Sequence, residues 1–444
     1  MVLKMLGAAV NTLLPPKYYV HACMSVLLIV VAHALAQGRR TNRERDMHAR
    51  VVLVTGGFTP LGLTLLQNLA ERGAHIIALA PKPIDDPEIE ILISLLRSTT
   101  NNEQVYAEEC DLTSPTSIRS FCTRFLTGKE NRIDAIVFAH EYPHIGSFLA
   151  FEDPVKLRRR RQEASLATFL ILTLLLPVLL VAPAERDIRI INVVNPFYSA
   201  AAVTYSPSQV PPAASSIFQQ EGRRSLQAII FTRHLQRVLD ALSSGGPPPG
   251  TDGNTVHVVS GKVQKSNIVA VSVCPGISRS DIIAPLFNAD GFRRRSTGGM
   301  ILYLVLQPLL RILTKSSTSA VQSVLHVLFL PTPFKGVAQS SSAGTRTSGG
   351  DTVQEVLKAG ALYRECAVVN IRIPVLENAS SSSDQGDPKD TVMVDDRELG
   401  GLHLGQAVWE VFEADLKEWE KQSVPSSEKQ GTDDDKPSVD TPDN

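Results

Sequence analysis

The chain of 444 residues has few cysteines and almost no net charge, and both features exclude classes of protein. Its five cysteines are scattered and form no Cys-x-x-Cys pair, which argues against a zinc site and a disulfide scaffold and fits a reducing compartment. Lys plus Arg number 44 against 45 Asp plus Glu, so a chain-wide nucleic-acid footprint is absent. No Gly-x-Ser-x-Gly elbow supports a serine hydrolase. Apolar residues make up 43% of the chain, which is enough for a sizeable core and excludes a wholly disordered protein.

A segment without Lys, Arg, Asp or Glu runs from Tyr18 to Gln37 near the amino terminus. Twenty helical residues at about 1.5 Å each span about 30 Å, the thickness of a bilayer's hydrocarbon. We therefore expect residues 18–37 to form a single transmembrane anchor. Five arginines follow it (Arg39, Arg40, Arg43, Arg45 and Arg50) and two lysines precede it (Lys4 and Lys17). This asymmetry predicts a cytosolic main domain, on a membrane of the endoplasmic-reticulum type.

A cleaved signal peptide is the alternative interpretation of the same segment. The triplet Ala34-Leu35-Ala36 has the small-x-small form of a cleavage site. The leader before the apolar run is long and contains Pro15 and Pro16, and the arginine-rich flank disfavours translocation. A second apolar run, from Leu166 to Ala182, is interrupted by Pro177 and soon followed by a strand-like run, which favours a buried helix over a second span.

Short β-branched runs alternate with amphipathic helical patterns from Val51 onward. We expect strands at 51–55, 75–80, 104–107, 133–139, 189–194 and 269–273, and helices at 61–72, 117–126, 166–182, 215–242 and 404–422. This alternation predicts an α/β fold of the Rossmann type, a doubly wound parallel sheet with helices on both faces.

The composition divides the chain into seven segments. These are an N-terminal segment (1–17), the anchor (18–37), a basic juxtamembrane linker (38–50), one Rossmann-type domain (51–375), a polar linker (376–395), a C-terminal helix (396–422) and an acidic tail (423–444). We expect the tail to be disordered, and the Gly-, Pro- or Ser-rich stretches 243–253, 335–350 and 378–390 to be surface loops.

The first predicted strand ends in a glycine-rich turn that leads straight into a helix. The residues are Thr55-Gly56-Gly57-Phe58-Thr59-Pro60-Leu61-Gly62. Gly56 would form the tight turn, and Gly62 would let the helix pack closely on the strand. Backbone amides at the helix start would hold the pyrophosphate of a dinucleotide.

Together with later landmarks, this turn resembles the short-chain dehydrogenase/reductase superfamily. The run VVLVTGGFTPLGLTLLQNLAERGAHIIALA resembles its first βαβ unit, RIDAIVFA its fourth strand, TFLILTLLLPVLL with DIRIINVV its central helix and fifth strand, VAVSVCPGIS its sixth strand and GALYRECAVV a late strand. The resemblance implies that Thr55, Gly56, Gly57, Phe58 and Gly62 contact NAD(P)(H), with Asp111-Leu112 at the adenine and Pro275-Gly276 near the nicotinamide. It extends over about 51–374 and is strongest to a fungal group of membrane-anchored members with no assigned substrate.

Several family positions hold other residues in this chain. Pro60 replaces the second glycine of the turn, so it adds a ring and removes an N–H. The family's Asn-Asn-Ala-Gly becomes Phe138-Ala139-His140-Glu141. The catalytic Asn falls near Ala164 or Ser165, and the catalytic Ser falls at Asn195.

No Tyr-x-x-x-Lys occurs anywhere in the chain. In the family this pair shares one helix face, and its Lys lowers the pKa of the Tyr that moves the proton. Here the two positions fall near Glu221 and Ser225. Either a rewired enzyme uses Tyr198 or Tyr205 as proton donor, with Asn195 orienting a carbonyl and Arg224 replacing the lysine, or the chain is a pseudo-enzyme that serves as a membrane-attached scaffold.

The end of the second strand bears on the choice of coenzyme. Ala80-Pro81-Lys82 places no acid at the strand tip, and Asp85 comes later. Lys82 therefore favours NADP(H) over NAD(H), unless it is only a solvated loop residue.

Two further patterns have an ordinary and a functional interpretation. His140, Glu141 and His144 lack a third ligand at a defined spacing, so we expect loop residues and no metal. Arg293-Arg294-Arg295 followed by the apolar run 300–313 is either a basic-capped core helix or a lipid-facing lid. With the anchor, a lid would favour an apolar lipid, sterol or long-chain carbonyl substrate taken from the bilayer.

Overall fold

A computed structural model describes residues 18–128, 132–143, 145–148, 154–183, 185–206, 216–244, 266–289, 297–332, 355–373 and 398–423. Its centre is an eight-stranded sheet in the order β3-β2-β1-β4-β5-β6-β7-β8. The strands are β1 (Val51–Thr55), β2 (His75–Ala80), β3 (Val105–Glu109), β4 (Ala135–Phe138), β5 (Ile188–Val193), β6 (Ile268–Cys274), β7 (Leu362–Arg364) and β8 (Ala367–Val369). The strand order reverses between β1 and β4, where the ends of parallel strands leave a crevice for a ligand.

The predicted doubly wound parallel sheet is confirmed, with one addition at its edge. β1 to β7 pair in parallel, whereas β8 pairs antiparallel with β7. The run expected to be one late strand is therefore a tight hairpin, in which Glu365 and Cys366 adopt positive φ angles of 52° and 60°. Both residues form the turn, because two antiparallel strands need only a short connection.

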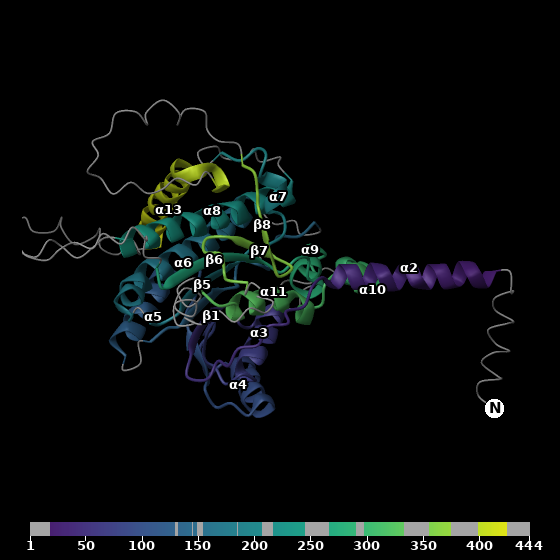
Figure 1. The fold of residues 1–444 in the computed structure, drawn as a ribbon, viewed down its shortest axis with the longest axis horizontal. Helices are drawn as coiled ribbons and strands as arrows, with labels where there is room; N and C mark the ends of the chain where they lie inside the picture. Colours follow the sequence, from purple (N-terminus) through teal and green to yellow (C-terminus); the bar gives the residue numbers. More distant parts are fainter. Residues whose placement is uncertain are drawn as a thin grey trace, which may run out of the picture.

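Helices cover both faces of the sheet (Figure 1). One core joins the sheet to α5 (Pro115–Thr127), α6 (Pro154–Val181) and α8 (Ile217–Ser244). The other joins it to α3 (Pro60–Ala70), α4 (Pro87–Thr100) and α11 (Ser317–Phe329). The run at 166–182 is indeed a mostly buried helix, since Leu170, Ile171 and Leu175 are at most 1% exposed.

The helix starts follow local capping rules. Side chains of Thr59, Asp86, Ser114 and Ser316 accept backbone N–H groups at the starts of α3, α4, α5 and α11. In α3, α4 and α5 a proline occupies the first turn, where no N–H is needed. α4 was not expected from the sequence, although Asp86-Pro87 marks its start.

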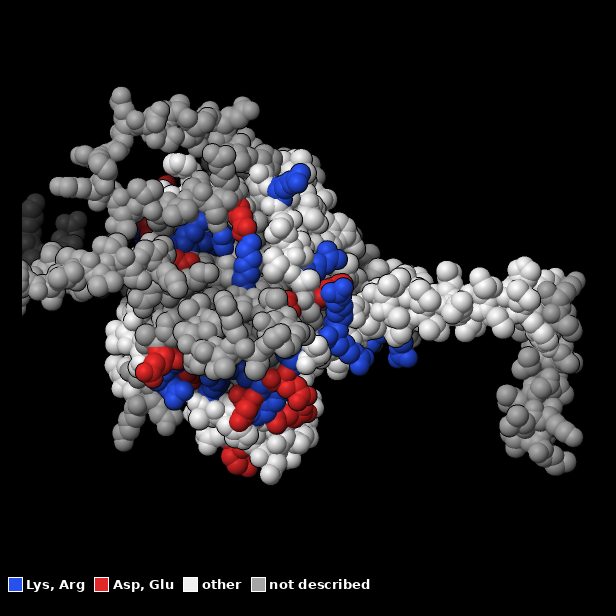
Figure 2. Space-filling model, in the orientation of Figure 1, with Lys and Arg blue, Asp and Glu red and all other residues white. Residues whose placement is uncertain are grey.

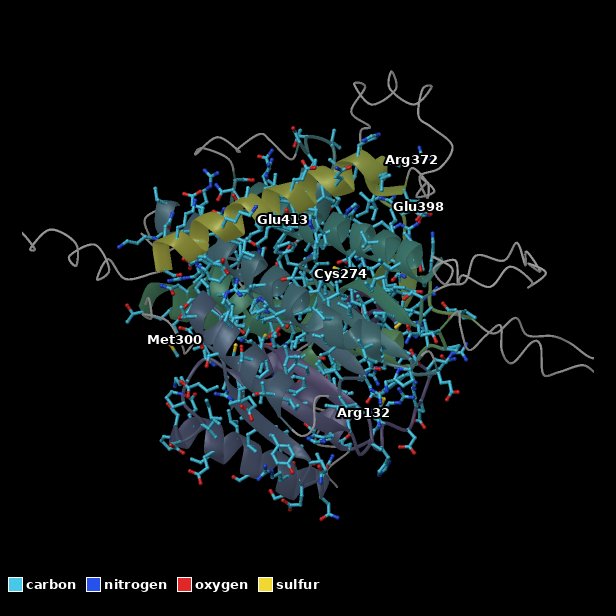
Figure 3. The ribbon with its side chains drawn as sticks, turned by 90° about the vertical axis from the view of Figure 1, so that its left-hand side faces the viewer. Arg132, Cys274, Met300, Arg372, Glu398 and Glu413 are labelled. Carbon is cyan, nitrogen blue, oxygen red and sulfur yellow. The ribbon has the colours of Figure 1, made fainter. Side chains whose placement is uncertain are left out.

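α13 (Gly401–Ser423) forms a further layer across α5, α6 and α8. Trp409 and Phe412 pack on Phe169 and Phe231, with ring centroids 5.2–5.7 Å apart. Figure 3, turned by 90°, places Glu413 on this outer helix and Cys274 in the interior of the domain. The C-terminal helix is therefore part of the packed domain.

The predicted anchor is a helix, α2 (Tyr19–Gln37), and it has no buried residue. It projects from the domain in Figure 1, and Figure 2 shows no charged side chain along it. Among the described residues, two helices are long and apolar enough to cross a membrane. α2 has no buried residue, whereas α6 is mostly buried in the domain. Only α2 therefore offers an apolar span to a bilayer.

Some expectations fall on residues outside those described. They are the stretches 335–350 and 378–390, most of 243–253, the tail beyond Ser423, His144 and Arg293-Arg294-Arg295. Several predicted boundaries were wrong. α6 begins at Pro154 and not at Leu166, and α8 continues to Ser244 at the edge of the Gly- and Pro-rich stretch.

Candidate active site

The glycine-rich turn has the predicted geometry between β1 and α3. Gly56 has φ of +68°, and a Cβ there would lie 2.6 Å from the backbone nitrogen of His140. A Cβ on Gly62 would lie 2.1 Å from the carbonyl oxygen of Gly56. Both positions therefore require glycine, because the turn presses against the end of β4 and against the helix that follows it.

The backbone donors at the start of α3 already have partners inside the protein. Pro60 has no N–H, and the amide of Gly62 donates to Oγ1 of Thr59 at 3.1 Å. The amide of Leu63 donates to the carbonyl of Thr59 at 2.7 Å. The amide of Leu61 donates to the Oδ1 atom of Asp281 at 2.9 Å.

Asp281 is thus a carboxylate seated at the amino terminus of the dinucleotide-type helix. It belongs to a π-helical turn, Arg279–Ile283, after β6, and is 1% exposed. Its Oδ2 accepts from the hydroxyls of Ser278 at 2.6 Å and Ser280 at 3.0 Å. A carboxylate here is a stand-in anion, since the helix dipole and the amide favour negative charge at this point. Asp281 shows that the start of α3 accepts an anion, which is the chemistry that the diphosphate of a dinucleotide would need there.

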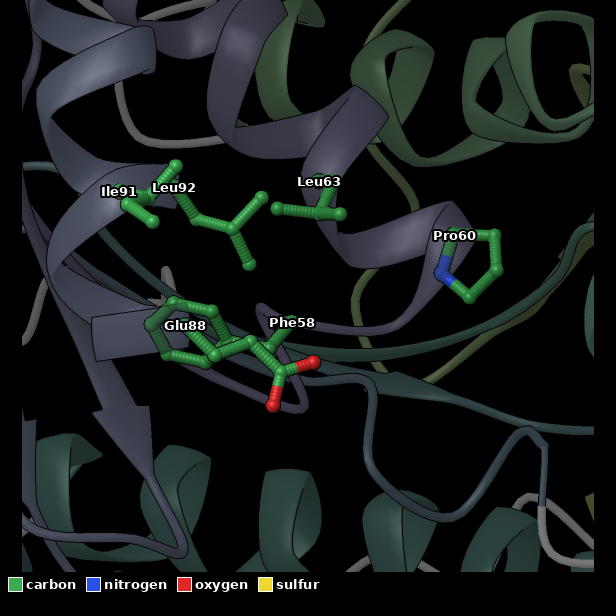
Figure 4. A pocket seen from close by; sticks show the side chains of 6 residues that line it. All are labelled: Phe58, Pro60, Leu63, Glu88, Ile91 and Leu92. Atoms are coloured by element: carbon green, nitrogen blue, oxygen red, sulfur yellow. The ribbon is translucent and has the colours of Figure 1, made fainter. Parts of the chain in front are cut away.

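A cavity of about 340 Å³ lies beside the turn, between α3 and α4 (Figure 4). Its lining is mostly apolar: Phe58, Pro60, Leu63, Ile91 and Leu92, with Glu88 as the charged member. Pro60 is therefore both the first residue of α3 and one of the residues that line the cavity.

The adenosine-side residues are held by local contacts. The carboxylate of Asp111 accepts from the amide and hydroxyl of Thr113 at 2.9 and 2.8 Å, while Leu112 packs against the core. Lys82 Nζ lies 2.7 Å from Glu88 and 3.5 Å from Asp86. The hydrogen bond to Glu88 raises the pKa of Lys82. Its charge is therefore already paired at the tip of β2.

Pro275 and Gly276 lie at the carboxyl end of β6 and are tied to two side chains. Lys315 Nζ donates to the carbonyl of Pro275 at 3.1 Å, and the Tyr142 hydroxyl donates to the carbonyl of Gly276 at 2.8 Å. Gly276 adopts φ of +97°. Tyr142 is a residue that sequence reasoning missed, because only the fold brings it from the end of β4 to β6.

The residues at the positions predicted for the family's catalytic groups belong to a buried ionic cluster centred on Glu221. Glu221 is fully buried and forms ion pairs with Arg161 and Arg224, the latter at 2.9 Å. The amide of Asn195 donates to Glu221 at 3.3 Å. Asn195 also accepts from the backbone amide of Phe197 at 3.1 Å. Asn195 and Glu221, which we predicted at or near the family's Ser and Tyr positions, are therefore joined by a hydrogen bond.

The second half of the cluster is built on His140 and Glu141. Glu141 accepts from Thr168 at 2.7 Å and Ser165 at 3.1 Å, and its backbone carbonyl accepts from Arg224 at 2.6 Å. His140 hydrogen bonds the Thr55 hydroxyl at 2.7 Å and the carbonyl of Ala164 at 2.9 Å. Burial lowers the pKa of His140, so its imidazole is neutral near pH 7.

The residues by which this chain departs from the family thus contact one another. His140-Glu141, Ala164-Ser165, Asn195, Glu221 and Arg224 belong to one hydrogen-bonded set. Arg161 of α6, which pairs with Glu221, was missed, because only the fold brings it to this acid.

Tyr198 and Tyr205 have other neighbours. Tyr198 lies in the short helix α7 (Tyr198–Ala201), 3% exposed, where Arg364 of β7 hydrogen bonds its side chain. The guanidinium of Arg223 lies 5.3 Å from the ring centroid of Tyr205. Burial raises the pKa of both phenols, which makes each a weaker acid than a free tyrosine.

The described residues contain no cluster of three or more His, Cys, Asp or Glu placed to hold a metal ion. His140 and Glu141 use their side chains within the cluster above.

Comparison with known proteins gives matches across much of the chain. A model of the KR domain matches residues 50–149. An uncharacterized oxidoreductase of Schizosaccharomyces pombe is 26% identical over 323 residues, which cover 70% of this chain and 78% of that protein. Another from Saccharomyces cerevisiae is 27% identical over 326 residues, covering 67% and 71%. Human polyprenol dehydrogenase is 25% identical over 258 residues, covering 57% and 68%.

Proposed function

Because the chain belongs to the short-chain dehydrogenase/reductase superfamily, with fungal oxidoreductases among its relatives, we propose that it is a membrane-anchored, NAD(P)(H)-dependent oxidoreductase. Its substrate would be an apolar lipid or sterol alcohol or carbonyl taken from the bilayer. The name of the human relative, polyprenol dehydrogenase, is consistent with a long apolar alcohol of this class.

The observation that carries this proposal is a continuous apolar surface on two neighbouring helices. α10 (Thr297–Leu313) contacts α2, and its side chains face outward. Exposed apolar residues of α10 are Met300, Ile301, Leu302, Leu304, Val305, Leu309 and Leu313. Of all the residues in α10, only Gly299 is buried and only Arg311 is charged. An apolar helix exposed beside a membrane anchor is best stabilised by lipid, since large exposed apolar patches destabilise a protein in water.

The base of this surface joins the candidate active site. The amide of Lys315, just beyond α10, donates to the carbonyl of Ile277 at 3.0 Å, next to Pro275-Gly276. Gln37, the last residue of α2, donates to the carbonyl of Thr314 at 3.2 Å. A lipid substrate entering along α10 would therefore arrive beside the nicotinamide-end residues.

The proposed topology follows from the charges at the base of α2. Basic side chains gather where the helix meets the domain (Figure 2), and Arg39, Arg40 and Arg43 follow it directly. Arg45 anchors the linker to the domain by an ion pair with Asp187 at 2.8 Å. We place the domain in the cytosol, at the endoplasmic reticulum, by the positive-inside rule.

The bound coenzyme would supply hydride transfer, and the chain's own residues would hold it and handle the proton. The turn at Gly56 and Gly57 would lie beside the diphosphate, the Leu61 amide would donate to it, and Asp111 would face the adenine end. Tyr198 is our candidate for the proton donor, because Arg364 beside it is a cation in the role of the missing lysine. We favour NADP(H), with Lys82 as the group that would meet a 2′-phosphate.

A second candidate function is supported by the Glu221 cluster. Two arginines and two glutamates, each at most 7% exposed, surround the position predicted for the family's catalytic tyrosine. A non-catalytic member that keeps the fold as a membrane-attached scaffold would retain such a cluster for stability alone. This chain would then transfer no hydride to any carbonyl, while its folding and its partner binding remained intact.

The test uses the full chain in lipid nanodiscs. Calorimetry with NADPH and NADH should give binding, and oxidation of a polyisoprenoid alcohol or reduction of its aldehyde should give turnover. Gly56→Ala adds a methyl 2.6 Å from the nitrogen of His140 and should abolish binding, whereas Gly128→Ala, whose nearest neighbour is 3.3 Å away, is the matched control. Binding without turnover across long-chain alcohols and aldehydes would favour the scaffold, and absence of binding would refute the coenzyme claim.

A further inference from the structure

We propose that Asp281 is an internal anion that occupies the diphosphate position of the coenzyme site and has to leave before a dinucleotide binds. This inference rests on the proposed function, since it concerns how that function's coenzyme enters. In this proposal the described structure is a closed state of the coenzyme site, in which Asp281 occupies the diphosphate position.

Asp281 accepts a hydrogen bond from the Leu61 amide, the backbone donor that a bound diphosphate would need. Pro60 has no N–H, and the amides of Gly62 and Leu63 donate within the turn. Of residues 60–63, Leu61 is thus the one whose amide reaches outside the turn, and its partner is Asp281. A second anion cannot share this amide at hydrogen-bond distance.

The charge of Asp281 also opposes a second anion. Its carboxylate is 1% exposed, and close like charges in a water-poor site repel far more strongly than in water. The hydroxyls of Ser278 and Ser280 donate to its carboxylate at 2.6 and 3.0 Å.

The segment that carries Asp281 is fastened to the membrane-facing helices. The amide of Arg279 donates to the carbonyl of Lys315, and the hydroxyls of Ser280 and Ser317 are hydrogen bonded at 2.8 Å. Residues 315–317 directly follow α10, whose end contacts α2. Asp281 therefore lies on a described segment that joins the start of α3 to the lipid-facing surface.

Calorimetric titration of NADPH into the full chain in nanodiscs tests the proposal. Asp281→Asn keeps an acceptor for Leu61 but removes the charge, and Asp281→Ala empties the position. We expect both variants to bind NADPH at least tenfold more tightly than the wild type, which is about 1.4 kcal/mol. Glu410→Gln, an exposed acid on α13, controls for the change in net charge and should leave the affinity unchanged.

Each outcome is decisive. If the wild type binds NADPH and Asp281→Asn binds it equally or more weakly, Asp281 does not block the coenzyme site, and the proposed function stands. No binding by any variant would refute both proposals. Hydrogen exchange gives a readout independent of affinity: the Leu61 amide should exchange faster in Asp281→Ala without coenzyme, and saturating NADPH should restore its protection. Unchanged exchange at Leu61 would show that Asp281 does not hold this amide.

Discussion

Glu221 and Arg224 lie one turn apart on α8 and form an ion pair at 2.9 Å, next to where the family places its tyrosine and lysine. Both are almost fully buried, and a second arginine, Arg161, contacts Glu221 from α6. Glu221 and its two arginines neutralise one another's buried charge, and this leads to the first prediction.

Glu221→Gln should strongly destabilise the protein. The change leaves Arg161 and Arg224 buried without their shared carboxylate, and breaking one partner of a buried pair costs about 3–5 kcal/mol. Urea unfolding of the full chain measures the loss. Glu420→Gln removes an acid from the exposed pair with Arg119 and should cost less than about 1 kcal/mol. Equal losses in the two variants would contradict a structural role for the cluster.

Stability should fall in acid through Asp187. Burial opposes its ionisation, but Arg189 and Arg45 outweigh burial and lower the pKa to about 2. An unfolded Asp binds its proton near pH 4, so between pH 4 and 2 the unfolded state holds more protons and stability decreases as pH falls.

This contribution is about 2 kcal/mol, fully present above about pH 5 and lost as pH falls through about 2. Asp187→Asn should lower stability at pH 7 and flatten the acid limb of a stability–pH profile. Asp85→Asn, at an exposed position, should leave the profile unchanged. An unchanged acid limb in Asp187→Asn would argue against this assignment.

α10 should lie in lipid. Leu304 is 69% exposed on its apolar side. Leu304→Trp in vesicles containing brominated lipids should therefore show quenched fluorescence beyond that of the native Trp409 and Trp419. Ile91→Trp on α4 is 63% exposed but distant from α2 in Figure 1, and it should add an unquenched signal. Equal quenching of both variants would show that α10 does not lie in lipid.

Tyr198→Phe should lower kcat about 10²–10⁴-fold if Tyr198 donates the proton. Because burial raises the pKa of Tyr198, the wild-type rate should fall only at strongly alkaline pH. Tyr205→Phe keeps the ring under Arg223 and should leave kcat within a few-fold of the wild type. A full rate in Tyr198→Phe, with normal coenzyme binding, would exclude it as donor.

Lys82→Ala should weaken NADPH binding and leave NADH binding unchanged. A 2′-phosphate would have to compete with Glu88 and Asp86 for the Lys82 ammonium, so we expect a modest loss, about 3–10-fold. Parallel calorimetric titrations with the two coenzymes measure it. Equal losses of affinity for NADPH and NADH would show that Lys82 does not contact the 2′-phosphate.

Most of the fold follows from the order of residues along the chain. The strands at 51–55 and 75–80 were predicted to the residue, because alternating apolar runs and the turn between them are local signals. α4 was not predicted although its sequence is rich in Ile and Leu. The β7–β8 hairpin was expected as one late strand, because two three-residue strands leave a weak pattern. The glycine-rich turn could also be predicted from the sequence, because Gly62 packs on the adjoining Gly56 and Gly57. The contact of Gly56 with His140 comes only from the fold.

The amino-acid order alone determined the apolar anchor, the parallel sheet and the absence of the Tyr-x-x-x-Lys pair. Only the tertiary structure decided that Asp281 reaches Leu61 across 220 residues and that Arg161 meets Glu221 across 60. The physical reason is range: hydrophobic periodicity and caps act within a few residues, whereas a buried charge is placed by whichever distant element the fold packs against it.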